Sequence, residues 1–500
     1  MKKINYIIVF LLSMFLINNM VYATPVNSSF KDDNFYKCII NSYNTANNDT
    51  KTIEYNITDA DLLTIKTLNC GNYEKDDADK IVDLTGIGKL ANVEDLYINS
   101  NKIITLNLSE NSKLKNLYAD NNSISSIALN NLENLVSVRL SGNNLSSIIL
   151  ENNNSLVLLD LGNFTTINNG ARDKCEGNNL TSLVLTGAPN IEHLYLCNNK
   201  LTNLDVSGNT KLLEIRARDN EISDLKLGNN DKITYIEMTN NKLNSLDISK
   251  DVALKILSVG NNMLEAINLN NNVNLETLNI DSNLLTKIDL SKNTKLQTLS
   301  IKNNKISNLD ISNNPKIGGL NANNNNITSI DLSKNDKISL LKISNNNLMS
   351  IDLSSVNVVL ESNITFDSQK RTITISKKDG KYILNLKEND ENINLDKITF
   401  VTQDNMTYAD GILTFTEIPK EIKYTYKTGL SNDMDVTLLI NPVVNEIVED
   451  SSSDEVQPNV DEKAESPKTG YYFGGASVLI LIAGASYLLK RKSFSSIPKI

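Results

Sequence analysis

The chain has 500 residues, enough for two or three domains with a sizeable core. Its net charge of −10 argues against a nucleic-acid partner, because nucleic acids select basic surfaces. It contains no Trp, one His and eight Pro, whereas Asn is abundant. The four cysteines form no CxxC pair, so we expect no zinc site, and no other metal or cofactor site is predicted.

Residues 1–23 have the pattern of a secretory signal peptide. Lys2 and Lys3 give a positive start, and Ile4 to Ile17 is mostly apolar. Val21-Tyr22-Ala23 places small or modest side chains before the cleavage that we expect after Ala23. The apolar run is short for a membrane span, and an uncleaved anchor helix is the alternative.

A 21-residue repeat fills the centre of the chain. Leu275 to Lys295, LETLNIDSNLLTKIDLSKNTK, shows the unit, and twelve such units cover residues 93–358. The spacing changes once, from 21 to 35 residues between Leu156 and Ile191, where an insertion around 162–172 lengthens the fourth unit. One unit cannot bury its own apolar face, so the units must stack on one another.

This pattern resembles the leucine-rich-repeat family, over more than half of the chain. The resemblance implies a mostly β solenoid in which each LxLxx forms a short strand beside the next, about 4.8 Å away. The second half of each unit repeats LxxLxL, which predicts a second short strand on the convex side and little helix. One Asn recurs in every unit, such as Asn262 and Asn283, and we expect it to bridge the backbones of adjacent turns.

Residues 24–92 are expected to form the N-terminal region and a short helical cap. Thr58-Asp59-Ala60-Asp61 supplies an N-cap and early acidic residues, and LLTIKTL follows with helical spacing. This segment resembles the cap of internalin-type proteins, which are surface adhesins. Cys38 and Cys70 lie here, and Cys175 and Cys197 flank neighbouring repeats; the sequence leaves both possible disulfides open.

Residues 359–443 differ from the repeats. Runs such as RTITIS, KYILNL and IKYTY are rich in β-forming residues and are separated by turns. They predict a small C-terminal β-sandwich domain that caps the solenoid. Residues 444–465 are acidic and lack aromatic side chains, so we expect an unfolded linker there.

Residues 466–500 combine three features in order. The motif Ser466-Pro467-Lys468-Thr469-Gly470 precedes an apolar stretch, 471–489, that is long enough to be a membrane helix. Lys490, Arg491 and Lys492 then form a basic tail that stays cytoplasmic. This order resembles the cell-wall sorting signal that sortases read, commonly LPxTG, although Ser466 stands in place of Leu.

The sortase resemblance implies two partners. A sortase would attack the Thr469 carbonyl and release Gly470, after which a peptidoglycan amine would take Thr469. The expected location is therefore outside the cell, covalently anchored to a Gram-positive cell wall, with residues 444–465 lifting the folded part off the wall. A plain single-span membrane anchor is the alternative.

One column of the repeat predicts a binding surface. Strand side chains alternate, so the residue between the two inward leucines should face out on the concave side. The first seven units place aromatic or charged residues there, and four of the last five place small or uncharged polar residues. The predicted ligand-binding residues are Tyr97, Tyr118, Arg139, Asp160, Tyr195, Arg216 and Glu237, with Asp95, His193 and Tyr235 from the neighbouring position.

Exposed Tyr and Arg are residue types that anchor interfaces, and chance composition is the alternative. No nucleophile elbow, HExxH or glycine-rich phosphate loop occurs, so we do not expect an enzyme. The sequence predicts an adhesin or host-interaction protein with an unidentified protein or glycan ligand. The alternative is a structural envelope protein that binds the organism's own wall polymers.

Two further features leave their interpretation open. The insertion either reaches over the concave face or is a tolerated surface excursion. A convex acidic column either binds a divalent cation or, as we favour, has each carboxylate bonded to the backbone of its own turn. That column comprises Asp205, Asp247, Asp289, Asp310, Asp331 and Asp352.

Overall fold

The computed structural model describes residues 27–72, 76–165, 174–356, 360–401 and 403–446. The described residues all belong to one compact unit. The predicted signal peptide, most of the linker and the whole sorting signal lie outside the described residues. No described helix is long and apolar enough to cross a membrane, and the predicted span 471–489 is not among the described residues.

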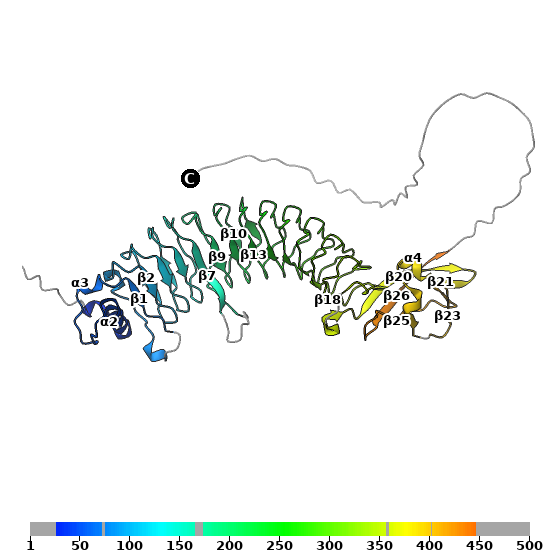
Figure 1. The fold of residues 1–500 in the computed structure, drawn as a ribbon, viewed down its shortest axis with the longest axis horizontal. Coiled ribbons are helices and arrows are strands. Elements are labelled where there is room, and N and C mark those ends of the chain that lie inside the picture. The colour runs from blue at the N-terminus through cyan, green and yellow to red at the C-terminus, as the bar shows by residue number, and fades with distance from the viewer. Residues whose placement is uncertain (1–26, 73–75, 166–173, 357–359, 402, 447–500) are drawn as a thin grey trace, which may run out of the picture. The chain divides into compact units, whose positions relative to one another are not determined.

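A long parallel sheet runs through the repeats (Figure 1). Each of the twelve predicted units contributes one strand, which confirms the leucine-rich-repeat solenoid. The strands are β2 (Asp95–Tyr97), β4 (Asn116–Tyr118), β6 (Ser137–Arg139), β7 (Leu158–Thr165), β9 (His193–Leu196), β11 (Glu214–Arg216), β13 (Tyr235–Glu237), β14 (Ile256–Ser258), β15 (Thr277–Asn279), β16 (Thr298–Ser300), β17 (Gly319–Asn321) and β18 (Leu340–Lys342).

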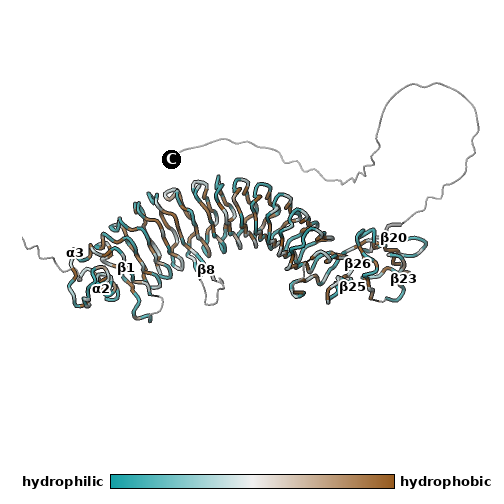
Figure 2. Tube along the Cα trace, viewed as in Figure 1, coloured by the Kyte–Doolittle hydropathy of each residue, from teal (hydrophilic) through white to brown (hydrophobic). Residues whose placement is uncertain are grey.

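Each coil buries its leucines against the coils on either side. In β15, Leu278 is fully buried, whereas Thr277 and Asn279 beside it are half-buried. Figure 2 shows the same alternation along every turn, with apolar segments in brown and polar ones in teal. Because each coil covers the apolar face of the next, the stability of one repeat depends on its neighbours.

The recurring Asn side chains join successive coils. Asn262 donates from Nδ2 to the carbonyl oxygens of Met238, at 2.9 Å, and Val259, at 3.0 Å. Its Oδ1 accepts from the backbone N–H of Leu243 at 2.9 Å. One side chain therefore satisfies buried backbone groups in two adjacent units, which confirms the predicted architectural role.

A second Asn column, which we did not predict, occurs later in the unit. Asn272 donates from Nδ2 to the carbonyl oxygens of Ile248 and Asp251, both at 3.0 Å. In the seventh unit Asp251 itself stands at the corresponding position and is 1% exposed. The buried Asn members are Asn111, Asn153, Asn209, Asn230, Asn272, Asn293, Asn314 and Asn335.

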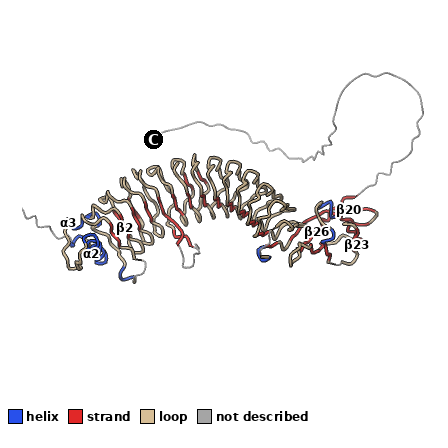
Figure 3. The backbone as a smooth tube through the Cα atoms, in the orientation of Figure 1, coloured by secondary structure: helices blue, strands red, loops and turns tan. Residues whose placement is uncertain are grey.

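The convex side carries the predicted second strand only in part. β3 (Thr105–Asn107) pairs with β5 (Ser126–Ala128), and β10 (Asn203–Asp205) pairs with β12 (Asp224–Lys226). Among the other described units, a single bridge from Ala128 to Ile149 continues this pairing. Figure 3 shows the red strands of the long parallel sheet in successive coils, one coil after another along the arc. The outer side of an arc is longer, so its segments lie too far apart for a continuous ladder.

The N-terminal cap contains a helix that the sequence analysis missed. This helix, α2 (Asp33–Asn47), begins where the Asp32 carboxylate accepts from the backbone N–H groups of Asn34 and Phe35. Cys38 of α2 is disulfide-bonded to Cys70, with the two Cα atoms 5.6 Å apart. This disulfide ties the helix to the first coil.

The predicted cap helix is present but shorter than expected. Thr58 and Asp61 form a capping box at the start of α3 (Asp59–Leu62). The expected helical continuation through LLTIKTL is wrong, because Thr67–Asn69 forms β1, which pairs in parallel with β2. The backbone of this segment is therefore hydrogen-bonded to the solenoid sheet and not within a helix.

The last repeat continues directly into the C-terminal β region. β19 (Ile364–Thr365) pairs with β18, and Gln369 then takes the place of the recurring Asn. Gln369 donates from Nε2 to the Ile343 and Phe366 carbonyl oxygens, at 3.0 and 2.7 Å. The hydrogen-bond ladder of the solenoid therefore extends into the β domain.

The C-terminal domain, predicted as a small β-sandwich, is β-rich, and its seven strands are hydrogen-bonded into one sheet in the order β22-β25-β26-β20-β21-β24-β23. The buried Tyr424 hydroxyl donates to the Met349 carbonyl oxygen at 2.8 Å, which joins this sheet to the last repeat. Its strands are β20 (Gln369–Lys378), β21 (Lys381–Asn385), β22 (Ile398–Phe400), β23 (Met406–Ala409), β24 (Ile412–Phe415), β25 (Glu421–Tyr426) and β26 (Met434–Glu446).

β26 runs past residue 443 into the segment predicted as linker, because its last residues pair with β20. The remaining elements are short. They are β8 (Lys174–Glu176), α4 (Leu386–Asn389) and the 3-10 turns η1 (Asn27–Ser29), η2 (Asp77–Asp79), η3 (Ile87–Lys89), η4 (Glu361–Asn363) and η5 (Leu395–Lys397).

Candidate functional site

The predicted binding column lies along one line of the concave sheet. Successive members are strand partners, as Tyr97 is to Tyr118 and Arg216 is to Glu237. The apolar residues directly before and after each member are buried. They point into the core, so the members of the column point to the opposite, concave face of the sheet. The structure therefore brings the predicted residues together in two clusters, which Asp160 separates.

The first cluster, here called the tyrosine–arginine stack, consists of Tyr97, Tyr118 and Arg139. The two tyrosine rings lie parallel, with centroids 4.7 Å apart and planes 9° apart. The Arg139 guanidinium lies 5.2 Å from the centroid of the Tyr118 ring. Each side chain thus covers a face of its neighbour, and the stack presents ring edges and the exposed guanidinium to the concave surface.

Asp95 lies beside this stack on β2. Its carboxylate accepts from Asn116 Nδ2 at 2.6 Å and from the Thr67 hydroxyl at 3.3 Å. Both partners come from the neighbouring strands, β4 and β1. Asp95 is therefore held by the sheet itself.

Asp160 differs from its prediction. It keeps the register of the column, between Arg139 and Tyr195, but it is 3% exposed. β7 continues past the usual strand length and β8 pairs back on it, so the start of the insertion covers the carboxylate. Asp160 accepts from the Gly162 N–H at 3.2 Å and from Asn163 Nδ2 at 3.3 Å.

Burial is the main cause that raises the pKa of Asp160, to about 6. The hydrogen bonds from Asn163 and Gly162 and the charge of Arg139 act in the opposite direction. A covered carboxylate cannot contact a large ligand directly. We therefore remove Asp160 from the binding surface and regard it as a support for the insertion, whose described part leaves on the concave side (Figure 1).

The second cluster, here called the Arg216 cluster, is built around Glu214 and Arg216 of β11. The Arg216 guanidinium lies between two rings, 5.3 Å from the Tyr195 centroid and 5.1 Å from the Tyr235 centroid. Its Nε donates to Glu214 Oε1 at 2.5 Å. Glu214 Oε2 also accepts from the Tyr195 hydroxyl at 2.9 Å and lies 3.3 Å from His193 Nδ1.

These contacts set the ionisation of the Arg216 cluster. Burial acts to raise the pKa of Glu214, but the hydrogen bonds from Arg216 and Tyr195 outweigh it, so the pKa is lowered. Burial and the hydrogen bond to Glu214 raise the pKa of Tyr195 to about 12. Glu214 therefore stays ionised and Tyr195 stays neutral near pH 7, which keeps the cluster rigid.

Glu237 closes this cluster on β13. Burial raises its pKa, and the charges of Arg218 and Arg216 act against the increase. The Tyr235 hydroxyl lies 3.5 Å from its carboxylate. Glu237 is therefore a half-buried member of the cluster.

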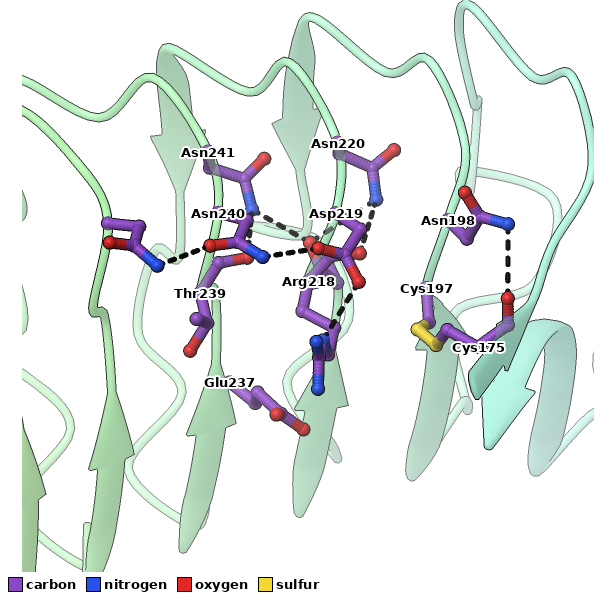
Figure 4. A network of polar contacts seen from close by, with 12 residues as sticks. Cys175, Cys197, Asn198, Arg218, Asp219, Asn220, Glu237, Thr239, Asn240 and Asn241 are labelled. Atoms are coloured by element: carbon purple, nitrogen blue, oxygen red, sulfur yellow. Dashed lines mark hydrogen bonds and ion pairs between the residues drawn. A yellow bond between two sulfur atoms is a disulfide. The ribbon is translucent and has the colours of Figure 1, made fainter. Parts of the chain in front are cut away.

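A polar network runs along the edge of this surface (Figure 4). Arg218 Nε donates to Asp219 at 2.9 Å, and Asn240 Nδ2 donates to the same carboxylate at 2.5 Å. At the end nearest the insertion, Cys175 and Cys197 form a disulfide, with their Cα atoms 6.0 Å apart. This disulfide fixes the base of the insertion to the end of β9.

No protein-family model matches the sequence, and no curated protein sequence matches it. Solved structures do match. The functional domain of InlJ from Listeria monocytogenes is 23% identical, with a TM-score of 0.55; the match covers 84% of this chain and 99% of that chain. The internalin inlF from the same organism is 24% identical, with a TM-score of 0.55, over 68% of this chain and 98% of that chain.

A leucine-rich-repeat protein of Leptospira interrogans is 20% identical, with a TM-score of 0.50, over 62% of this chain and 78% of that chain. The fold is that of an internalin-like leucine-rich-repeat solenoid. Similarity at this level of identity establishes the fold but does not identify a ligand.

The second half of the internalin-like solenoid has a plainer concave face. Ser258, Asn279, Ser300 and Asn321 occupy the column there, and Lys342 ends it. Among these described residues no aromatic stack forms. The strands of both halves pair in the same parallel register. The solenoid fold therefore does not by itself require different side chains in the two halves of the column.

The carboxylates of the convex acidic column bond the backbone of their own turns, as we expected. Asp289 and Asp310 each accept from the backbone N–H of the serine two residues later, at 3.0 and 2.9 Å. Hydrogen bonds from the backbone and hydroxyl group of Ser291 lower the pKa of Asp289, and those from the hydroxyl group and backbone of Ser312 lower the pKa of Asp310. Within the described ranges, no group of three or more His, Cys, Asp or Glu side chains could hold a metal ion.

Asn116, Arg218 and Asp219 are surface residues that the sequence analysis did not select. Asn116 was detectable, because it belongs to the same neighbouring column as Asp95. Arg218 and Asp219 follow the end of a strand, where the backbone turns to a positive φ of 56° at Asp219, so simple alternation does not predict where they point.

Proposed function

We propose that this chain is a non-catalytic surface protein that binds a protein or glycan ligand through the concave face of its first seven repeats. Its role would be that of an adhesin or host-interaction factor. The supporting observation is the sorting of the concave column: two clusters of stacked Tyr and Arg side chains, separated by the buried Asp160, lie between β2 and β13, whereas Ser and Asn occupy the column from β14 to β17. Tyr and Arg held rigidly before binding lose little entropy when a partner docks.

Replacing Tyr97, Tyr118 and Arg139 together with Ala is expected to abolish binding to an identified ligand. The stack is on the surface, so the circular dichroism spectrum should not change. The matched control replaces Ser258, Asn279 and Ser300, which occupy the same column in later repeats. Loss of binding only in that control would place the site elsewhere.

A binding screen with host extracellular proteins in one arm and purified wall glycans in the other tests the role. Binding to host proteins supports the adhesin function. Binding to the organism's own wall polymers alone would favour the structural envelope function instead.

We further propose that Ser466 to Gly470 is a sortase signal and that Thr469 becomes the peptidoglycan-linked C-terminus, after cleavage of residues 1–23. Mass spectrometry of wall digests should find Thr469 joined to a peptidoglycan fragment. Replacing Pro467 or Thr469 should move the protein to the membrane or the medium. Recovery of residues 470–500 on the mature surface protein would contradict covalent anchoring.

A further inference from the structure

Some charged side chains of the concave face form an ion pair within the protein, and others do not. Glu214 pairs with Arg216, whose side chain is 18% exposed, and Arg218 pairs with Asp219. Arg139 is exposed and touches the Tyr118 ring. Within the part of the chain that the structure describes, no oxygen accepts a hydrogen bond from the Arg139 guanidinium and no carboxylate forms an ion pair with it.

Asp160 is the acidic residue next to Arg139 in the column; their charges interact, but the two side chains form no ion pair or hydrogen bond. Asp160 is covered by the start of the insertion and accepts from Gly162 and Asn163. The guanidinium of Arg139 is therefore held in place through one face, by Tyr118, while its N–H edge donates no hydrogen bond to any residue that the structure describes. A stacked guanidinium with a free edge is arranged to bind a carboxylate through two parallel hydrogen bonds.

The geometry of the stack also distinguishes between ligand classes. Sugar rings bind aromatic side chains chiefly through an open ring face, because the π electrons lie there. Tyr97 and Tyr118 cover each other's faces, and Arg139 covers the other face of Tyr118. In the second cluster, Arg216 covers a face of Tyr195 and of Tyr235. Both faces of Tyr118, and one face each of Tyr97, Tyr195 and Tyr235, are thus already in contact within the protein. The surface therefore offers ring edges and hydroxyl groups more than open ring faces, which suits protein side chains better than sugar rings.

We infer that the partner is a protein, and that an Asp or Glu side chain of that partner binds Arg139, with an aromatic or aliphatic side chain beside it on the edges of Tyr97 and Tyr118. This inference rests on the proposed concave-face function and narrows it to one ligand class. The acidic side chain supplies an ion-pair partner, which the described residues do not supply to Arg139. The neighbouring apolar side chain would keep water away from that ion pair, as in interface hot spots.

The test uses the full-length protein and a random peptide library displayed on phage. Peptides selected on the unmodified protein should contain Asp or Glu next to an aromatic or aliphatic residue. Synthetic versions should bind at least about tenfold more weakly to the Arg139→Gln variant, as expected when a charged hydrogen-bonded pair is lost. Arg139→Glu should select peptides with Lys or Arg in place of the acidic residue. Lys342→Gln is the matched control, since Lys342 is a cation in the same column, and it should change nothing.

Three outcomes would overturn the inference, and they are separable. Peptides that lose binding on Tyr97→Ala or Tyr118→Ala, but not on Arg139→Gln, would leave the concave-face function standing and remove the acidic anchor. Arg139-dependent binding of a polyuronate with no acidic peptide enriched would reassign the ligand to an anionic glycan. Selected peptides that are insensitive to every concave substitution would refute the proposed function itself.

Discussion

Replacing Asp251 with Asn is expected to stabilise the folded protein by about 2–4 kcal/mol at pH 7 to 8, and by almost nothing near pH 4. Asp251 stands in the second Asn column, where each Asn donates from Nδ2 to backbone carbonyl oxygens, as Asn272 does to Ile248 and Asp251. A carboxylate cannot donate. Asp251 is 1% exposed, and neither of its oxygens has a hydrogen-bond partner among the described residues.

The sign of the pH dependence follows from the pKa of Asp251. Burial, and secondarily the charge of Asp247, raise the pKa of Asp251 to about 7 in the folded protein, against about 4 in the unfolded chain. Between these values the folded state binds the proton more tightly than the unfolded state. The contribution of this group is therefore fully present below pH 4 and is lost as the pH rises through about 7.

Urea denaturation at a series of pH values from 4 to 8 measures this effect. The curves of unfolding free energy for the unmodified protein and Asp251→Asn should diverge as the pH rises. The matched control combines Asn272→Asp with Asp251→Asn, which moves the carboxylate to the next coil and should introduce a similar pH dependence there. Parallel curves for the unmodified protein and Asp251→Asn would show that the buried carboxylate is ionised in the fold without cost.

The repeats were predictable from the sequence because their period fixes the register. A strand in every unit, the inward position of residues such as Leu278 and the bridging by Asn262 all follow from one 21-residue pattern. The same pattern displays the second Asn column and the exception at Asp251. This signal is visible in the sequence and needs no structural information.

The cap and the insertion were less predictable, because their structures depend on contacts between distant segments. α2 is rich in polar residues, and it is stabilised by burying side chains such as Phe35 and Ile39. Its only strong local signal is Asp32 as N-cap. The sequence of β1 has helical spacing and by itself favours a continuation of α3. It forms a strand because it pairs with β2. Likewise, strand alternation correctly places Asp160 on the concave side but cannot show that the insertion covers it.

Both disulfides illustrate the same limit. Four cysteines allow three pairings, and sequence spacing does not choose among them. In the fold, the Cα atoms of Cys38 and Cys70 lie 5.6 Å apart and those of Cys175 and Cys197 lie 6.0 Å apart, within the range that a disulfide spans. Each pair joins an element outside the regular repeat, α2 or the insertion, to a coil of the solenoid.

Replacing Leu278 with Ala is expected to cost about 2–5 kcal/mol of unfolding free energy. Leu278 is the central residue of β15 and is fully buried. It lies in register with Leu257 on one side and Leu299 on the other, so truncation leaves a cavity that borders three coils. A stacked coil contacts only its neighbours, so they cannot close the cavity without shifting the ladder of hydrogen bonds.

Asn279→Ala is the matched control at the next position of the same strand. The Asn279 side chain is half-buried on the concave face and accepts one hydrogen bond, from the Asp281 N–H at 3.1 Å. Its loss should cost less than about 1.5 kcal/mol, since one hydrogen bond at a hydrated surface contributes little. Urea denaturation of the two variants measures the contrast. Equal costs would show that the inward and outward positions are wrongly assigned, and the assignment of the binding column to the concave surface would fail with them.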